Sequence, residues 1–254
     1  MVTIGIIGAG RVGSTLRAAL TEAGYSVVSP PDADLIIIAV PDDALAGVVA
    51  ELAIRPGQVV AHTSGAHGIG VLAPAVARGA RPLAIHPAMT FTGRPEDLER
   101  LRKGIPFGVT APPDVRPLAE TLVRDLGGTP EWIAEERRTL YHAALAHGAN
   151  HLVTLVNEAL DRLRDAGVVH PEKVLDPLLH AALDNALRLG DAALTGPVSR
   201  GDAGTVAGHL AALEATAPES VPAYRALARR TAERAVAAGR LTPAQAAPIE
   251  EATR

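Results

Sequence analysis

Three closely spaced glycines near the start of the chain constrain its fold more than any other feature. The segment Gly8-Ala9-Gly10-Arg11-Val12-Gly13 directly follows an apolar run at residues 3–7. The first glycine permits a tight turn, the second lets a pyrophosphate approach the backbone, and the third lets a helix pack closely on a strand. A helix beginning there points its N–H groups and positive dipole end at phosphates. The pattern therefore predicts a strand, loop and helix that bind a dinucleotide, in preference to a ligand-free glycine turn or a site for FAD or S-adenosylmethionine.

Short apolar runs alternate with helical patterns through the first half of the chain, which is typical of a parallel sheet covered by helices. From Glu135 onward the strand patterns stop, and apolar residues recur at spacings of three and four. We therefore expect an α/β fold, a Rossmann-type doubly wound parallel sheet over residues 1–134, followed by an all-α domain over residues 135–254. The predicted strands lie at residues 3–7, 26–29, 34–40, 58–62, 81–85, 105–109 and 131–133, and the first-half helices at 13–23, 44–52, 71–77 and 114–126.

A second buried strand ends in Val40-Pro41, which places a rigid turn at the carboxyl edge of the sheet, where ligands bind in such folds. The expected dinucleotide contacts are therefore Gly8, Ala9, Gly10, Arg11, Val12, Gly13, Val40 and Pro41. The connection between the second and third predicted strands is short, because only four residues separate Ser29 from Asp34. A complete dinucleotide fold usually has a helix there, and the strand ending at Ser29 carries no acid for the adenosine ribose. The missing acid argues against NAD, and no arginine is present there that would favour NADP instead.

Composition narrows the class of protein further. The formal net charge of −4 gives no electrostatic reason to expect nucleic acid or an anionic membrane as partner. The sequence has no cysteine, which excludes disulfides, thiolate nucleophiles and Cys-ligated metal. No apolar run in the first half approaches the ~20 residues of a membrane span, and the first residues do not resemble a secretory signal. We expect a soluble, cytoplasmic protein.

Several longer stretches resemble a known superfamily. GIIGAGRVGSTL, ADLIIIAVPDDAL, AHTSGAHGIGVLAP and IHPAMTF are similar to segments of 6-phosphogluconate-dehydrogenase-like proteins, among them pyrroline-5-carboxylate reductase, ketopantoate reductase and prephenate dehydrogenase. LYHAALAHGANHLVTL and LTGPVSRGDAGTVAGHL resemble the more specific group that joins a Rossmann-like half to a C-terminal domain of unknown function, the DUF2520 family. The resemblance covers nearly the whole chain.

This resemblance implies an oxidoreductase that uses NADP or NAD, more often NADP, and a homodimer formed through the helical domain. It also exposes a departure from the pattern. Several relatives carry a catalytic lysine four residues before a helical asparagine, and here Ala146 precedes Asn150 at that spacing. Tyr141 and His142 are the local candidates to replace that lysine.

Candidate catalytic residues follow two predicted strands. His62, Thr63 and Ser64 come after one strand, and the resemblance places Ser64 and the following glycine beside the nicotinamide. A histidine titrates near neutral pH and can donate or accept a proton. His86 follows the next strand and resembles the His-Pro of prephenate dehydrogenases, with Thr90 beyond it as a hydroxyl for the substrate. The alternative for His62 is a loop residue that caps the next helix.

Further candidates lie in the second half. His142 and Asn150 are eight residues apart on a predicted helix, so they face nearly the same side, either at the site or as buried polar groups holding the domains together. Arg200 lies in a Gly-Pro loop and could bind a substrate carboxylate, or pair with Asp202 to cap the next helix. The nine histidines offer no convincing ligand set, so we expect no metal.

These features support two hypotheses. The first is a reductase or dehydrogenase dependent on NAD(P) that acts on a small 2-oxo acid or cyclic imine, with catalytic residues His62, Ser64, His86, His142 and Asn150. The second is a dinucleotide-binding sensor or regulatory protein without catalysis, favoured by the missing lysine and the short segment after Ser29.

Overall fold

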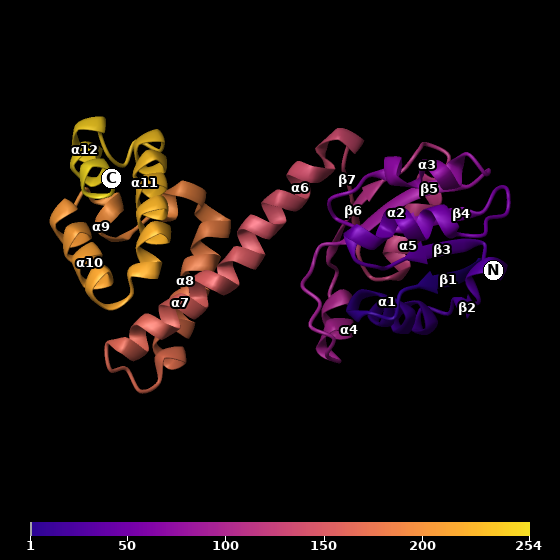
Figure 1. Cartoon of the computed structure of the whole chain (residues 1–254), viewed down its shortest axis with the longest axis horizontal. Coiled ribbons are helices and arrows are strands. Elements are labelled where there is room, and N and C mark those ends of the chain that lie inside the picture. Colours follow the sequence, from indigo (N-terminus) through magenta and orange to yellow (C-terminus); the bar gives the residue numbers. More distant parts are fainter. Residues whose placement is uncertain (1) are drawn as a thin grey trace. The chain divides into compact units, whose positions relative to one another are not determined.

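The computed structural model describes residues 2–254 and divides them into two compact units (Figure 1). The sheet unit ends at Asn150, and the helical unit runs from His151 to Arg254. Ala134, the predicted domain boundary, lies just after the last strand, and the sheet unit continues beyond it through the next helix.

The sheet unit contains the predicted Rossmann-type architecture. Seven strands form one sheet in the order β2-β1-β3-β4-β5-β6-β7. Every strand predicted from the sequence is present, with ends that differ by a few residues. Their bounds are β1 (Thr3–Ile7), β2 (Ser26–Val28), β3 (Leu35–Ile38), β4 (Val59–His62), β5 (Arg81–Pro87), β6 (Pro106–Thr110) and β7 (Thr129–Trp132).

The sheet is mostly parallel, and the expectation of a wholly parallel sheet is wrong at one pair. β6 runs antiparallel to β5, with Phe107 opposite Pro87, and β7 is parallel to β6. The segment between β5 and β6 holds only one short helix, α4 (Glu96–Leu101), which the sequence did not predict. This helix packs beside α1 (Arg11–Glu22), and the chain re-enters the sheet at the edge where β5 ended.

Two apolar layers hold the sheet between helices, and both consist almost entirely of aliphatic side chains. One layer joins Ile4, Ile6 and Leu83 of the sheet to α1 and α5 (Arg116–Asp125). The other joins Ile36, Ile38 and Val60 to the helices on the opposite face. Those helices are α2 (Asp42–Glu51), the 3-10 helix η2 (Ile69–Leu72) and α3 (Ala73–Val76).

The short connection after β2 is a 3-10 turn, η1 (Pro30–Asp32), that packs directly on the first strand. A Cβ on Gly5 would lie 2.5 Å from Pro30 Cα. The side-chain amide of Gln58 donates to the carbonyl of Ala33 at 2.6 Å. Gly5 leaves room for the turn, and Gln58 is hydrogen-bonded to its end. A four-residue connection can therefore take the place of the usual helix and still pack on the sheet.

Helical conformation continues from the sheet unit into the helical unit. α6 (Arg138–Leu145) is followed by a π-helical segment η4 (Ala146–Asn150) and then by α7 (His151–Asp165). The predicted single long helix is therefore interrupted by one wide turn, a rare feature that is frequent at functional sites.

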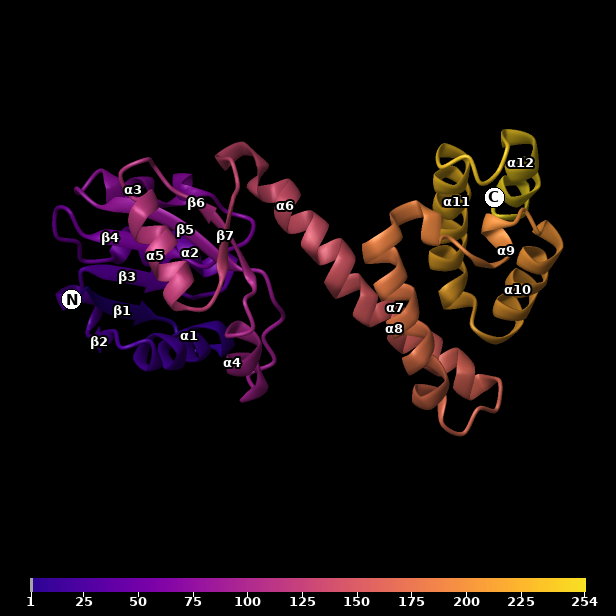
Figure 2. The ribbon, with the colours of Figure 1, turned by 180° about the vertical axis from the view of Figure 1, so that it is seen from behind.

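The helical unit contains one small core. Its last helices gather into one cluster (Figure 2). Val206, Leu210, Ala232 and Ile249 are buried among the last helices. After α7, the helices are α8 (Pro171–Leu189), η5 (Gly190–Ala193), α9 (Gly196–Ser199), α10 (Ala203–Thr216), η6 (Pro218–Ser220), α11 (Val221–Ala237) and α12 (Pro243–Ala252).

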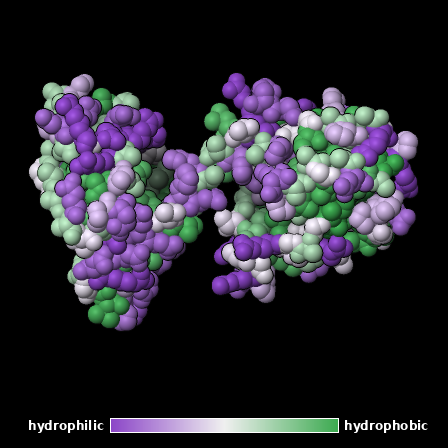
Figure 3. All heavy atoms as spheres, viewed as in Figure 1, coloured by the Kyte–Doolittle hydropathy of each residue, from purple (hydrophilic) through white to green (hydrophobic). Residues whose placement is uncertain are grey.

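The apolar stripe predicted along the long helix is present but is not buried within the chain. Leu140 of α6 is 64% exposed, and Leu152 and Leu155 of α7 are also exposed. Leu187 of α8 is 79% exposed. Apolar side chains are visible on the surface of the helical unit in Figure 3.

The close approach of η1 to β1 gives a stability prediction. We expect Gly5→Ala to lower the free energy of unfolding by at least about 2 kcal/mol, because the new Cβ overlaps Pro30 backbone. Gly47→Ala is the matched control, since a Cβ there meets nothing within 4 Å on helix α2. The control is expected to gain up to about 1 kcal/mol from helix propensity. Urea denaturation measures both, and equal stability of the two variants would contradict the prediction.

Candidate functional site

The three glycines of the loop after β1 have two different reasons to be glycine. Gly8 has a φ of 110°, and a Cβ on it would overlap the carbonyl oxygen of Ala39. A Cβ on Gly13 would overlap the carbonyl oxygen of Gly8. Both positions are therefore fixed by the fold itself. A Cβ on Gly10, by contrast, meets nothing within 4 Å, so the fold does not require glycine there.

Gly10 is also the N-cap of α1, and no side chain caps that helix. The first N–H groups of a helix lack partners within the helix. Here they lie beside an open surface where Ala9, Gly10 and Arg11 are all exposed. Val40 and Pro41 come after β3, where Pro41 is the exposed N-cap of α2.

A cavity of about 440 Å³ lies within the sheet unit. It brings together five residues selected from the sequence, namely Val12, His86, Thr90, His142 and Asn150. His142 and Asn150, which are eight residues apart in the chain, therefore both face this cavity. The remaining lining residues are Thr63, Pro87, Ala88, Met89, Phe91, Leu145, Ala146 and Ala149.

His62 and Ser64 do not line this cavity. His62 is fully buried at the end of β4, where its Nε2 lies 2.8 Å from the carbonyl oxygen of Gly68 and its Nδ1 accepts from the Ser64 N–H. The Ser64 hydroxyl accepts from the His67 N–H and lies 3.0 Å from His67 Nδ1. Both polar side chains therefore bond within their own loop, and neither caps the 3-10 helix η2 that follows it.

The buried guanidinium of Arg138 joins three segments of the sheet unit. Arg138 is 1% exposed and begins α6. Its Nε donates to the carbonyl of His67 at 2.9 Å, its Nη1 to Gly108 at 2.9 Å and its Nη2 to Ser64 at 2.6 Å. All three acceptors are backbone carbonyls, so the positive charge is solvated by the backbone and is not neutralised by a carboxylate.

Glu135, an acid on the same segment as Arg138, is bonded to other groups. Its carboxylate accepts from the N–H groups of Ile69 and Gly70 at 2.7 and 2.8 Å. Glu135 therefore fixes the start of η2, the continuation of the loop that Arg138 holds.

Next to Arg138 lies a cluster of three rings. Tyr141 is 5.6 Å from the guanidinium, and its hydroxyl lies 3.0 Å from His86 Nδ1. His86 meets both Tyr141 and His142 edge to face, at 5.7 and 6.0 Å between ring centroids.

Two glycines make room for these rings. A Cβ on Gly65 would lie 2.5 Å from His142 Cδ2, and a Cβ on Gly108 would lie 2.6 Å from the Tyr141 hydroxyl. Gly65 follows β4 and Gly108 is paired with His86 across β5 and β6. The sheet and the loop thus place the rings at one end of β5.

Burial and Arg138 keep the two sheet histidines neutral. Burial, followed by the charge of Arg138, lowers the pKa of His86 to about 4. Burial lowers the pKa of His62 to about 4, partly offset by the bond to Gly68. Burial raises the pKa of Tyr141, while Arg138 acts in the opposite direction. At neutral pH His86 is therefore an uncharged imidazole that donates from one nitrogen and accepts at the other.

A structured loop closes one side of the cavity. Met89, Thr90 and Phe91 line the cavity from this loop. The fully buried carboxylate of Asp97 accepts from the N–H groups of Thr92 and Gly93 at 2.8 and 2.7 Å and holds the loop in place.

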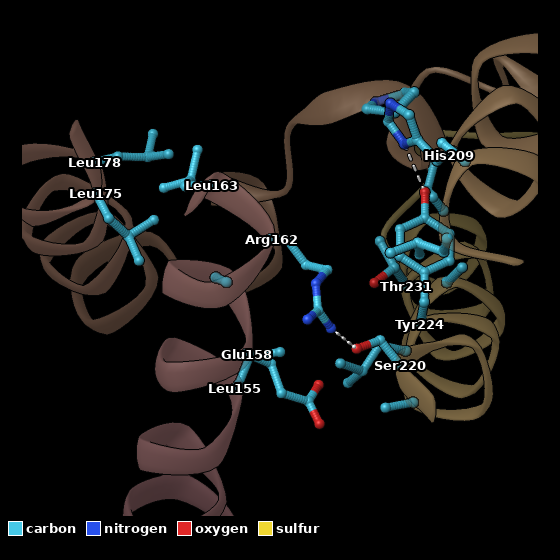
Figure 4. A pocket seen from close by; sticks show the side chains of 18 of the residues that line it. Leu155, Glu158, Arg162, Leu163, Leu175, Leu178, His209, Ser220, Tyr224 and Thr231 are labelled. Carbon is cyan, nitrogen blue, oxygen red and sulfur yellow. Dashed lines mark hydrogen bonds between the residues drawn. The ribbon is translucent and has the colours of Figure 1, made fainter. Parts of the chain in front are cut away.

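The helical unit contains its own cavity, of about 760 Å³, lined mainly by apolar side chains (Figure 4). Two polar pairs lie in its wall: His209 Nδ1 is 2.8 Å from the Tyr224 hydroxyl, and Arg162 donates to the Ser220 hydroxyl at 2.8 Å. Arg200, the predicted carboxylate ligand, is exposed at the end of α9 and does not line this cavity. Asp202 caps α10 by accepting from Thr205.

Within residues 2–254, no group of three or more His, Asp or Glu side chains is arranged to hold a metal ion. In the same residues, no helix combines the length and apolarity needed to cross a bilayer.

The buried position of Arg138 beside the ring cluster is not predicted by the sequence. An arginine at the start of a helix is normally expected to be exposed. The three carbonyls that accept hydrogen bonds from Arg138 lie 30 to 74 residues away in the chain. One signal was available, because Arg138 precedes Tyr141 and His142 by three and four residues and therefore shares their helix face.

Comparisons with known proteins agree with this architecture. A family model described as a domain of unknown function, DUF2520, matches residues 105–231, and a Rossmann-like domain model matches residues 29–87. A search of curated proteins finds no matching sequence.

Solved structures share the fold at low sequence identity. A candidate NADP oxidoreductase from Bacteroides fragilis is 22% identical with a TM-score of 0.75, over 91% of this chain and 98% of that one. A Thermotoga maritima protein, TM1727, is 21% identical with a TM-score of 0.73, over 93% and 100%. A reductive aminase from Aspergillus terreus, solved with NADPH and ethyl levulinate, is 17% identical with a TM-score of 0.67, over 99% of each chain.

The lowered pKa of His62 predicts a pH dependence of stability. The unfolded chain binds a proton at this histidine below pH ~6.5, whereas the folded chain does so only near pH 4. Stability from the neutral ring is therefore complete above pH ~6.5 and declines as the pH falls toward 4, by about 2 kcal/mol between pH 7 and 5.

Urea denaturation at pH 7 and pH 5 measures this decline. His62→Gln is expected to show a smaller decline than the wild type, and the same substitution at exposed His170 controls for the loss of a histidine. An identical pH dependence in wild type and His62→Gln would show that His62 does not contribute.

Proposed function

This chain belongs to the DUF2520 family, and from that premise we propose that it is a reductase or dehydrogenase that uses a nicotinamide dinucleotide and acts on a small carbonyl or imine compound. The sequence points to small 2-oxo acids and cyclic imines as substrate classes. The observation that carries the proposal is the open space above Gly10, between two glycines that the fold itself requires.

The geometry of the loop supports a phosphate ligand. Gly8 and Gly13 shape the turn, Gly10 leaves the backbone bare, and α1 begins there without a capping side chain. A pyrophosphate would supply the missing acceptor for the helix N–H groups. Val12 of the same helix lines the cavity that contains His86 and His142, so a dinucleotide anchored at the loop would extend toward the ring cluster.

NADP is the proposed cofactor, with NAD as the alternative. β2 ends at Val28, and Ser29 follows it where an acid would bind the ribose 2′-hydroxyl of NAD. The carboxylate of Asp34 accepts hydrogen bonds from the N–H and the hydroxyl of Thr3. Thr3 begins β1, so Asp34 lies at the amino ends of the parallel strands, away from the position of the ribose. The solved structures described as an NADP oxidoreductase and as an NADPH complex support a nicotinamide dinucleotide in general.

A sensor that binds the dinucleotide without catalysis is the second candidate. Ala146, at the position of the relatives' lysine, lines the cavity and offers no proton. Substrate-dependent oxidation of NADPH separates the two candidates, because a sensor would bind NADPH without consuming it.

Gly10→Ala tests the proposed cofactor site. We expect it to weaken NADPH binding at least about tenfold, since the added methyl group occupies the space of the pyrophosphate, a loss of about 1.4 kcal/mol. Its melting temperature should match that of the wild type, because the Cβ meets no protein atom within 4 Å. Gly47→Ala, on α2 and also without contacts, is the control. Calorimetric titration with NADPH and NADH measures the affinities, and wild-type affinity in Gly10→Ala would contradict the proposal.

A homodimer is the proposed assembly. Several large apolar side chains on α7 and α8 are more than half exposed, among them Val153, Leu178 and Leu187. Exposed apolar area on this scale is typical of interaction surfaces. A second copy would cover these residues, of which Leu178 also lines the cavity of the helical unit.

Light scattering after gel filtration tests the assembly. The wild type is expected at twice the chain mass of 26.2 kDa, and the double variant Leu178→Glu, Leu187→Glu is expected to shift to the monomer. Val76→Glu, at an exposed apolar position of the sheet unit, should keep the wild-type mass. A monomeric wild type would refute the dimer without affecting the cofactor proposal.

A further inference from the structure

The cavity of the sheet unit has a mainly apolar lining with five polar side chains, none of which is permanently charged. Its polar lining residues are Thr63, His86, Thr90, His142 and Asn150. A substrate carboxylate placed there would lose its hydration and meet no guanidinium or ammonium among the lining residues. An uncharged substrate would not have this cost.

A positive charge lies beside the ring cluster, but its buried side chain does not line the cavity and therefore does not face a carboxylate bound there. Arg138 uses its Nε, Nη1 and Nη2 on the carbonyls of His67, Gly108 and Ser64. Its charge still acts on Tyr141 and on His86. This field opposes a cationic ligand, such as a protonated cyclic imine, and favours negative charge that develops on a bound oxygen.

The ring cluster offers a proton path toward such an oxygen. His86 lines the cavity, and its Nδ1 lies 3.0 Å from the Tyr141 hydroxyl, which does not line the cavity. When Tyr141 donates to Nδ1, the proton of the neutral imidazole is on Nε2. His86 can then donate to a substrate oxygen while Tyr141 replaces the proton from behind.

We propose that this cavity selects an uncharged ketone or aldehyde over both a 2-oxo acid and a protonated cyclic imine. The inference rests on the proposed function, because a bound reduced nicotinamide supplies the hydride that adds to the carbonyl carbon. The electron pair of the C=O π bond moves to the oxygen, which takes the Nε2 proton of His86. His86 Nδ1 takes the hydroxyl proton of Tyr141, and the tyrosinate beside Arg138 regains a proton from water. One hydride and one proton thus convert the carbonyl to an alcohol.

A matched set of substrates tests the selection with the full chain and NADPH. Methyl 2-oxopentanoate and 2-oxopentanoate share a carbon skeleton and differ in charge, and 2-methyl-1-pyrroline provides the protonated imine. We expect kcat/KM for the ester to exceed both others at least about tenfold, the effect of about 1.4 kcal/mol. Faster use of the acid or the pyrroline overturns the proposal. A preference for the acid that disappears in Arg200→Ala would also overturn it and would assign the carboxylate ligand to the helical unit.

If none of the three compounds is turned over, the binding of two unreactive ligands tests the same selection. Butyramide and butyrate are titrated calorimetrically into the protein saturated with NADP+. Tighter binding of the amide supports the proposal, while tighter binding of butyrate, or no binding of either, overturns it. Failure of the proposed function is a separate result, namely no binding of NADPH or NADH to the wild type.

Tyr141→Phe tests the proton path. It is expected to lower kcat for the ester at least about tenfold, within the range of general acid catalysis, and to leave the NADPH dissociation constant within about twofold. Tyr25→Phe is the matched control, because the Tyr25 hydroxyl bonds to Asp125 and does not line the cavity. An unchanged kcat in Tyr141→Phe would remove Tyr141 from the path.

Discussion

The sheet unit depends on the single buried guanidinium of Arg138. Its three donors bind carbonyls of the loop after β4 and of the middle of β6, so one side chain fixes the loop, the sheet and the start of α6 to one another. Removal of a buried charged donor leaves its partners unsatisfied, which typically costs several kcal/mol. The position of Tyr141 and His142 follows from this arrangement, because both lie within one turn of Arg138 on α6.

The same guanidinium determines the chemistry of the rings. A carboxylate partner would cancel its charge, whereas backbone carbonyls satisfy its hydrogen bonds without cancelling it. Burial is the larger cause of the lowered pKa of His86, about 4, and the charge of Arg138 adds to it. The guanidinium is therefore fixed in place while its charge still acts on the ring cluster. A carboxylate partner would also fix it but would cancel the charge.

The sequence was sufficient for features that depend on local patterns. The strand, glycine loop and helix from Thr3 onward, the seven strand positions and the shared cavity of His86, His142 and Asn150 follow from periodicity and from the ends of strands. Features that depend on contacts between distant segments were not predictable. The reversed direction of β6 leaves no trace in its own residues, and the full burial of His62 and Arg138 requires carbonyls supplied by other segments.

The two units also differ in how far they account for their own stability. The sheet unit buries apolar side chains on both faces of its sheet, and its loops are held by buried polar groups such as Asp97 and Arg138. The helical unit has one core, whereas α8 leaves most of its residues exposed, including Leu183 and Leu187. Helices of this kind gain most of their stability from packing of an apolar face, so α8 needs a covering surface in order to contribute. The sheet unit thus covers its apolar layers within one chain, whereas α8 of the helical unit keeps an exposed apolar face.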